Sequence, residues 1–263
     1  DRILFFLIFD FYEMFGDDVK IAAEVLGITL TSRNHGGSGS IPLAGVPYHQ
    51  GEKYLAGLLK AGYGVAVCEQ VQDPSAAKGL VDREVVRVVT PGMIIDNELL
   101  EKESNNYVLA VFHRNDRFGI SAIDISTGSF RLCESNDARA VGDELLRIDP
   151  KEIVLPESAQ TDAALAFVRR LFSETAVTYV PEAEFDFTFS REKLIRQFAT
   201  RSLEGFGCEK LTAGVGAAGA LLSYVHQTQK QEAAQVTAIE TYYLDNYLLV
   251  DETTCRNLEL FSN

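Results

Sequence analysis

Three glycines between residues 214 and 219 match the Gly-x-Gly-x-x-Gly spacing of a dinucleotide-binding loop. In such a loop the glycines let the backbone approach a pyrophosphate, and a buried strand must lead into the loop. The residues that precede Gly214 read Glu-Lys-Leu-Thr-Ala, which is a poor strand. We therefore interpret Gly214, Gly216 and Gly219 as small residues in a closely packed helix.

The cysteines and histidines lack the spacings typical of metal or nucleophilic sites. There is no Cys-x-x-Cys pair, and no histidine has metal-site or Ser-His-Asp spacing. We expect buried, reduced thiols in a cytoplasmic protein, with the histidines on the surface or in loops. The cysteines are Cys68, Cys133, Cys208 and Cys255, and the histidines are His35, His49, His113 and His226.

Hydrophobic patterning predicts a mixed α/β unit in residues 1–92. Acidic residues followed by apolar residues at helical spacing indicate a helix within residues 10–26, ended by Gly27. Apolar or β-branched runs indicate strands. The expected strands are 3–9, 28–31, 65–70 and 84–90, with an extended segment at 41–48 and a second helix at 52–61.

A polar linker over residues 93–106 separates this unit from a second one over 107–230. Three consecutive strands and then alternating helices and strands predict an α/β sheet domain there. The expected strands are 107–112, 119–125, 129–133, 152–155 and 177–180, and the expected helices are 138–148, 161–172, 191–198 and 213–229. Residues 231–263, with a strand at 247–250, are interpreted as the start of a third domain.

The composition suits packed cores but not phosphate binding. Hydrophobic residues make up 46% of the chain, and the net charge is −14. The first hundred residues carry 8 Lys and Arg against 13 Asp and Glu. Since DNA affinity depends on cations that neutralise phosphates, this balance argues against strong DNA binding by the chain alone. No apolar run reaches the roughly 20 residues of a membrane span, and no signal peptide is visible.

Several long stretches of the first hundred residues resemble the mismatch-binding domain of the MutS family of DNA mismatch repair proteins. They are DFYEMFGDDVKIAAEVLGITLTSR (10–33), IPLAGVPYH (41–49), YLAGLLKAGYGVAVCEQVQDP (54–74) and KGLVDREVVRVVTPG (78–92). The family's connector is matched by GISAIDISTGSF (119–130) and GVGAAGALLSYVHQTQ (214–229), and the start of its core by LVDETTCRNLEL (249–260).

The resemblance implies a mixed α/β mismatch-binding domain, an RNase H-like α/β connector and the beginning of a helical core. It also implies a homodimer that clamps mismatched double-stranded DNA and signals to a MutL-like partner through the connector, with ATP and Mg²⁺ held by an ATPase domain. No Gly-x-x-x-x-Gly-Lys-Ser/Thr loop occurs in this chain. We therefore expect no cofactor and no ATPase activity here.

By the same resemblance, the DNA-reading residues are Phe11 and Glu13, in the motif Phe-x-Glu. The aromatic ring stacks on the mispaired base, and the carboxylate hydrogen-bonds it. A mispaired base is weakly stacked, so a wedge inserts there at lower cost than in intact duplex. Arg33, His49 and Lys78 are expected to meet phosphates, although each has an ordinary alternative as a solvated surface residue.

Two positions before this motif depart from the family pattern. Family members usually carry a polar or basic residue where Leu7 stands, and glycine where Phe9 stands. Glycine permits backbone angles that phenylalanine adopts less easily. The local geometry around Phe9 is therefore in question.

Two alternatives remain open. Asp124 stands where RNase H-like nucleases place a metal-binding carboxylate, which would make the chain a metal-dependent nuclease. Such sites need several converging acids, and we find no second member, so a structural role is the simpler interpretation. The other alternative is a relative of the same architecture that binds branched DNA, which the departure at Phe9 allows and the Phe-x-Glu motif disfavours.

Overall fold

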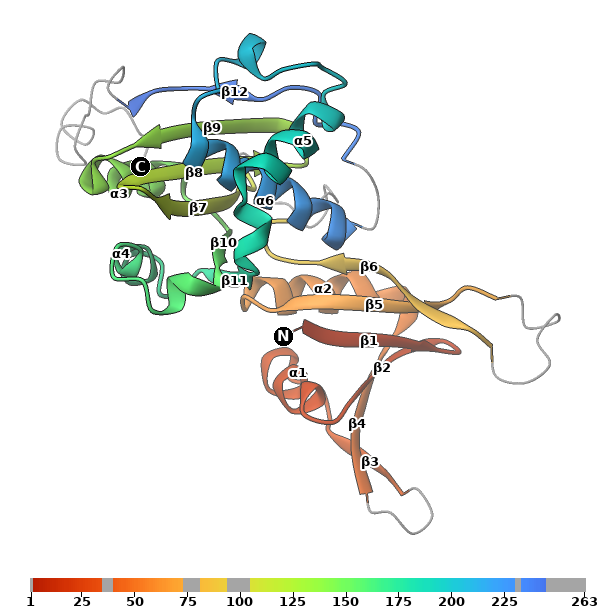
Figure 1. The fold of residues 1–263 in the computed structure, drawn as a ribbon. Helices are drawn as coiled ribbons and strands as arrows, with labels where there is room; N and C mark the ends of the chain where they lie inside the picture. The colour runs from red at the N-terminus through yellow and green to blue at the C-terminus, as the bar shows by residue number, and fades with distance from the viewer. Residues whose placement is uncertain (1, 35–39, 73–80, 94–104, 230–232, 245–263) are drawn as a thin grey trace, which may run out of the picture.

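A computed structural model describes residues 2–34, 40–72, 81–93, 105–229 and 233–244. They form two units, each built on a six-stranded sheet (Figure 1). This is the α/β class expected from the sequence. None of the helices in the described ranges combines the length and hydropathy needed to cross a bilayer.

The first unit is a two-layer arrangement of one sheet and two helices. Its strand order is β3-β4-β2-β1-β5-β6, and only β1 and β5 run parallel. The strands are β1 (Arg2–Ile8), β2 (Phe11–Phe15), β3 (Thr31–Asn34), β4 (Ser40–Pro47), β5 (Gly64–Gln70) and β6 (Arg83–Val89). The helices are α1 (Asp18–Leu26) and α2 (Gly51–Lys60). The 3-10 turn η1 (Tyr48–Gln50) joins β4 to α2.

Strand β2 corrects the sequence prediction of a helix beginning near residue 10. Tyr12 and Met14 are buried in the core that the two helices cover, whereas Phe11 and Phe15 are exposed. That alternation has the period of two of a strand, and the helix begins only at Asp18. Gly27 ends α1 with φ 64°, as expected. The strand predicted at 28–31 was also wrong, because pairing begins only at residue 31.

The second unit has three layers, with helices on both faces of its sheet. The strand order is β11-β10-β7-β8-β9-β12, with β7, β8 and β9 antiparallel and β10 and β11 parallel to β7. The strands are β7 (Val108–Arg114), β8 (Arg117–Asp124), β9 (Ser129–Ser135), β10 (Glu152–Pro156), β11 (Ala176–Val180) and β12 (Glu240–Thr241). The helices are α3 (Ala138–Ile148), α4 (Ala166–Leu171), α5 (Phe187–Gln197) and α6 (Thr212–Gln229). Short 3-10 turns are η2 (Glu157–Gln160), η3 (Glu182–Phe185) and η4 (Glu204–Phe206).

The two faces of this sheet carry separate cores. One includes side chains of α5 and α6, and the other includes side chains of α3 and α4. Helix α4 is shorter than the predicted 161–172, since turns and a bend occupy residues 161–165, where its first half was expected. Residues 233–242, which we assigned to the start of a third domain, pack on this sheet through β12. The strand predicted at 247–250 lies outside the described residues.

Helix α6 explains the glycine pattern at 214–219. The helix is buried along most of its length. A Cβ built on Gly216 would lie 2.6 Å from the carbonyl oxygen of Phe185, and one on Gly219 would lie 2.2 Å from Cβ of Ser190. The expectation of small residues in a closely packed helix is therefore confirmed. The first turn of α6 is capped from β9, because Glu134 accepts the backbone N–H groups of Ala213 and Gly214.

Candidate nucleic-acid interface

The β1–β2 hairpin carries the Phe-x-Glu motif on its outgoing strand. Ile8 pairs with Phe11 across a two-residue turn. A Cβ built on Gly45 of the neighbouring β4 would lie 3.7 Å from both Cδ1 of Phe11 and Cγ of Glu13. The two side chains therefore flank the bare backbone of Gly45, on the face of the sheet opposite the helices. Phe11 is 47% exposed.

Glu13 presents an unused hydrogen-bond acceptor on this face. The side chain is partly buried, and its Oε2 atom is buried without a hydrogen-bond partner among the described residues. A buried carboxylate oxygen without a donor is costly, and such groups are rare in folded proteins. The geometry suits a ligand that brings a donor to this oxygen.

The turn of the hairpin holds Phe9 in an unusual conformation. Phe9 has φ 52° and is 94% exposed. The favoured two-residue hairpin turns have positive φ at the first central position. Glycine is favoured there, because in other residues this angle brings Cβ too close to the backbone carbonyl oxygen. The local geometry that the departure at Phe9 put in question is therefore a turn with positive φ, an angle that glycine adopts readily.

The hairpin is held in place by Tyr12 and Tyr48. The Tyr12 hydroxyl donates to Glu69 at 2.9 Å, and burial together with that carboxylate raises the pKa of Tyr12. The rings of Tyr12 and Tyr48 lie 5.5 Å apart, and the Tyr48 N–H donates to the Asp10 carbonyl at 2.8 Å. Tyr48 is 52% exposed. The sequence analysis did not single out Tyr48, although it lies in the matched segment 41–49.

Of the three residues expected to meet phosphates, the structure describes the side chain of His49 alone. His49 is exposed in η1, and its Nε2 lies 3.4 Å from Nε2 of Gln50. Arg33 lies in β3 opposite Ile41, and its side chain is outside the described part of the structure. Lys78 lies outside the described residues altogether. His49 follows Tyr48, whose backbone is bonded to the hairpin turn, and phosphate contacts by the three residues stay predictions.

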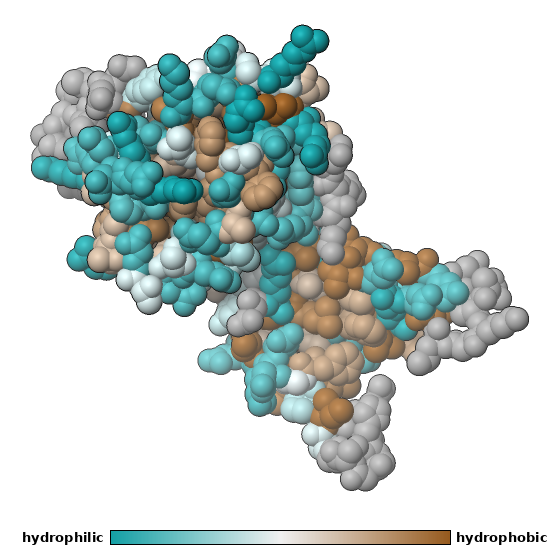
Figure 2. Space-filling view, in the orientation of Figure 1, coloured by the Kyte–Doolittle hydropathy of each residue, from teal (hydrophilic) through white to brown (hydrophobic). Residues whose placement is uncertain are grey.

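One cation that the sequence analysis missed lies on the same sheet face. The guanidinium of Arg83 lies 5.3 Å from the ring centroid of Phe6, and its Nε donates to the Leu7 carbonyl at 3.3 Å. Phe6 in turn packs edge-on against Phe15, with ring centroids 6.3 Å apart. Figure 2 shows apolar surface over the strands of this first sheet and a mostly hydrophilic second unit. The open face is thus aromatic, with a cation at its border.

Asp124 is engaged in holding a turn. It is 1% exposed, and its Oδ1 accepts the Ser126 N–H at 2.9 Å and the Ser126 hydroxyl at 2.6 Å. Its Oδ2 accepts the Asn106 N–H at 3.2 Å. Within the described ranges, no three His, Cys, Asp or Glu side chains converge as metal ligands would. The structural interpretation of Asp124 fits these contacts, and the nuclease alternative is not favoured.

A polar cavity of about 590 Å³ lies between residues of the two units. Its lining includes Arg2 and Thr90 from the first unit and Glu152 from the second. Glu152 is 1% exposed and accepts hydrogen bonds from Thr178, at 3.0 Å, and from Tyr224. Burial, and then the nearby Glu152 carboxylate, raise the pKa of Tyr224 to about 12. These contacts place a buried acid beside the junction of the units.

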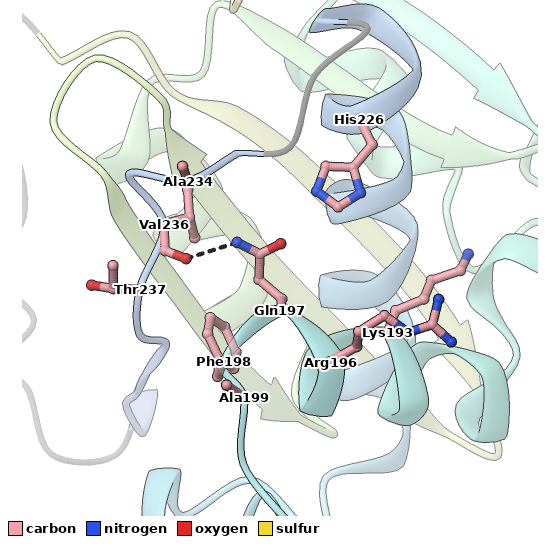
Figure 3. Close-up of a pocket in the computed structure, with 9 residues that line it drawn as sticks. All are labelled: Lys193, Arg196, Gln197, Phe198, Ala199, His226, Ala234, Val236 and Thr237. Atoms are coloured by element: carbon pink, nitrogen blue, oxygen red, sulfur yellow. Dashed lines mark hydrogen bonds between the residues drawn. The ribbon is translucent and has the colours of Figure 1, made fainter.

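A second cavity, of about 410 Å³, lies beside α5 and the end of α6 (Figure 3). The Gln197 amide donates to the Val236 carbonyl at 2.9 Å and holds the segment after α6 against α5. Lys193 and Arg196 also line the cavity, and Lys193 pairs with Glu184 at 2.6 Å.

Family comparisons agree with the two-unit fold. A model described as MutS domain I matches residues 1–98, and a model described as MutS domain II matches residues 106–240. The chain belongs to the MutS family. The matched ranges coincide with the two sheets, so this MutS chain carries its Phe-x-Glu hairpin in domain I and its buried helix α6 in domain II.

Curated relatives give the same result over the whole chain. The DNA mismatch repair protein MutS of Desulfosudis oleivorans is 55% identical over 263 residues, which is 100% of this chain and 30% of that protein. The protein of the same name from Desulforapulum autotrophicum is 47% identical, again over 100% of this chain and 30% of the relative. That of Desulfatibacillum aliphaticivorans is 45% identical over the same shares. The chain thus spans about 30% of the length of these relatives.

Proposed function

We propose that this chain recognises mispaired bases in double-stranded DNA as the reading portion of a cytoplasmic mismatch repair protein. In this proposal Phe11 stacks on the mispaired base, and Glu13 accepts or shares a hydrogen bond with it. The observation that carries the proposal is the pair itself: a half-exposed aromatic ring beside a carboxylate oxygen that has no donor among the described residues.

The stacking step draws its selectivity from the DNA. A base–aromatic stack contributes about 1–3 kcal/mol, whereas unstacking a paired step costs a few kcal/mol. At a mispair that unstacking cost is already partly met, so the balance favours insertion. Phe11 suits the role because its ring is accessible and carries no polar atom that would lose a hydrogen bond on insertion.

Glu13 adds discrimination through repulsion. A carboxylate near phosphates disfavours binding unless a base supplies a donor in return. The net charge of −14 supports the same view at larger scale, since the chain cannot bind intact DNA strongly through charge. Arg33, His49 and Lys78 remain the proposed phosphate contacts.

The remaining activities belong to the complete protein. We propose that it acts as a homodimer and that the second unit contacts a MutL-like partner. ATP and Mg²⁺ would bind outside this chain, which contains no phosphate-binding loop sequence. The domain limits proposed from the sequence, 1–92 and 107–230, serve as the starting point for dissecting these roles.

Fluorescence anisotropy at low ionic strength tests the reading function. Mispaired, fully paired and four-way-junction DNA would be titrated with the chain and with Phe11→Ala. We expect the preference for mispaired over paired DNA to fall by about 5- to 150-fold, the value of one lost stack. Phe15→Ala is a matched control, because Phe15 lies on the same strand and face and is 37% exposed.

Glu13→Gln provides a second, independent arm of the experiment. Removing the charge is expected to tighten binding to paired DNA more than to mispaired DNA. A chain in which Phe11→Ala keeps its full preference contradicts the proposal. Tighter binding to the four-way junction than to the mispair would favour the branched-DNA alternative instead.

A further inference from the structure

Phe9 is exposed at the apex of the hairpin in a conformation that its residue type disfavours. Its φ is 52° and its side chain is 94% exposed, so the ring has almost no packing within the described residues. A turn that needs positive φ is served by glycine, asparagine or aspartate with less strain. Strained residues of this kind concentrate at functional sites, so the outlier calls for a contact outside the chain.

The neighbours of Phe9 indicate what that contact is. Phe9 lies two residues before Phe11, and Tyr48 is tied to the same turn by its N–H bond to Asp10. Phe9 and Phe11 are thus two exposed rings close together in sequence at one end of the hairpin, with the backbone of Tyr48 bonded to the same turn, whereas Phe15, at the far end of β2, packs against Phe6. An aromatic group at one tip of a sheet suits bases, whose flat faces stack on any aromatic ring.

We propose that Phe9 is a second aromatic wedge, which contacts the base step beside the one that Phe11 enters. This inference rests on the proposed function. Two residues span at most about 7 Å of chain, and successive bases of one strand lie about 3.4 Å apart. The two rings therefore reach the same step or adjacent steps of one strand.

A second wedge has a consequence for substrate choice. Pyrimidine–purine steps such as TA unstack easily, whereas A-tracts are stiff. With Phe9 in place, binding depends on the step next to the mispair as well as on the mispair. The substrate class is therefore a mispair beside a flexible step.

The test uses the 263-residue chain, its Phe9→Gly and Phe9→Ala variants, and Phe11→Ala. Each is titrated with duplexes that carry one mispair flanked by either TA steps or an A-tract. The neighbouring base is replaced by 2-aminopurine, whose fluorescence rises when it unstacks. We expect both Phe9 variants to lose about 5-fold or more in affinity for the TA-flanked duplex, the lower end of one stack, and to lose the fluorescence rise.

The two Phe9 variants separate the ring from the backbone. If only Phe9→Ala weakens binding, the turn geometry is responsible and the inference is overturned. If neither Phe9 variant changes affinity or fluorescence while Phe11→Ala loses its mispair preference, the second wedge is refuted and the proposed function stands. If Phe11→Ala also keeps its preference, both fail together.

Discussion

Replacing Phe9 by glycine is expected to stabilise the chain even though the change removes a large hydrophobic side chain. Phe9 is 94% exposed, so little buried apolar area is lost with the ring. Its φ of 52° places its Cβ against the backbone, and glycine removes that contact. The substitution thus trades strain in the folded state against flexibility in the unfolded state.

Two opposing magnitudes decide the size of the effect. A residue with Cβ in the left-handed region costs roughly 1–2 kcal/mol. Glycine in turn lowers the unfolding free energy by about 0.5–1 kcal/mol, because it is more flexible in the unfolded chain than alanine. The net gain expected for Phe9→Gly is about 0.5–1 kcal/mol, or about 1–4 °C in Tm for a chain of this size.

Urea unfolding followed by circular dichroism would measure this gain on the whole chain. Phe9→Asn should show part of the gain, since asparagine tolerates positive φ, and Phe9→Ala should show almost none. Equal stability of Phe9→Gly and Phe9→Ala would refute the strain argument and would assign any gain to loss of the exposed ring. A loss of stability in Phe9→Gly would mean that the ring has packing that its exposure does not reveal.

Three further predictions concern the second unit. Gly119→Ala should cost about 1–3 kcal/mol or more in urea unfolding, because its Cβ would lie 2.0 Å from the Ala213 carbonyl oxygen; Gly205→Ala, with nothing within 4 Å, is the near-neutral control. Glu152→Ala should lower the unfolding free energy by about 1–3 kcal/mol, since buried hydroxyl donors lose their acceptor, and unchanged stability would contradict the hydrogen bonding described. Burial raises the pKa of Tyr224 to about 12, so the folded state holds the hydroxyl proton more tightly than the unfolded state. The protonated hydroxyl therefore contributes fully to stability below about pH 10, and this contribution is lost as the pH rises toward 12. Absorbance titration at 295 nm should show Tyr224 ionising only with alkaline unfolding. Tyr224→Phe should remove the part of the absorbance change that Tyr224 contributes.

Local signals in the sequence determined much of the fold. The Asn115-Asp116 dipeptide lies between the predicted strands 107–112 and 119–125, and both residues adopt the positive φ of a hairpin turn. Gly27 ended its helix as its position indicated. The small residues of α6 predicted close helix packing, which the contacts of Gly216 with Phe185 and of Gly219 with Ser190 confirm. Each of these signals acts within a few residues, so a single chain reveals it.

Residues 10–17 show where local signals mislead. The acids there suggested a helix start, yet pairing with β1 and β4 makes residues 11–15 a strand. Strand pairing depends on segments distant in the chain. Strand β4, one of the two partners of β2, follows α1 in the sequence. The sequence of the segment alone could not weigh that pairing against the helix.

The candidate site likewise has features that the sequence predicted and features that depend on the tertiary structure. The chain alone, through its resemblance to the MutS family, predicted that Phe11 and Glu13 read the DNA and that Phe9 stands where the family usually has glycine. Only the tertiary structure decided that both motif side chains flank Gly45 on an open sheet face, that one Glu13 oxygen lacks a donor among the described residues, and that Phe9 adopts the glycine angle. Exposure and hydrogen-bond satisfaction depend on which distant strands and helices cover a residue, and residue type and spacing do not encode that directly.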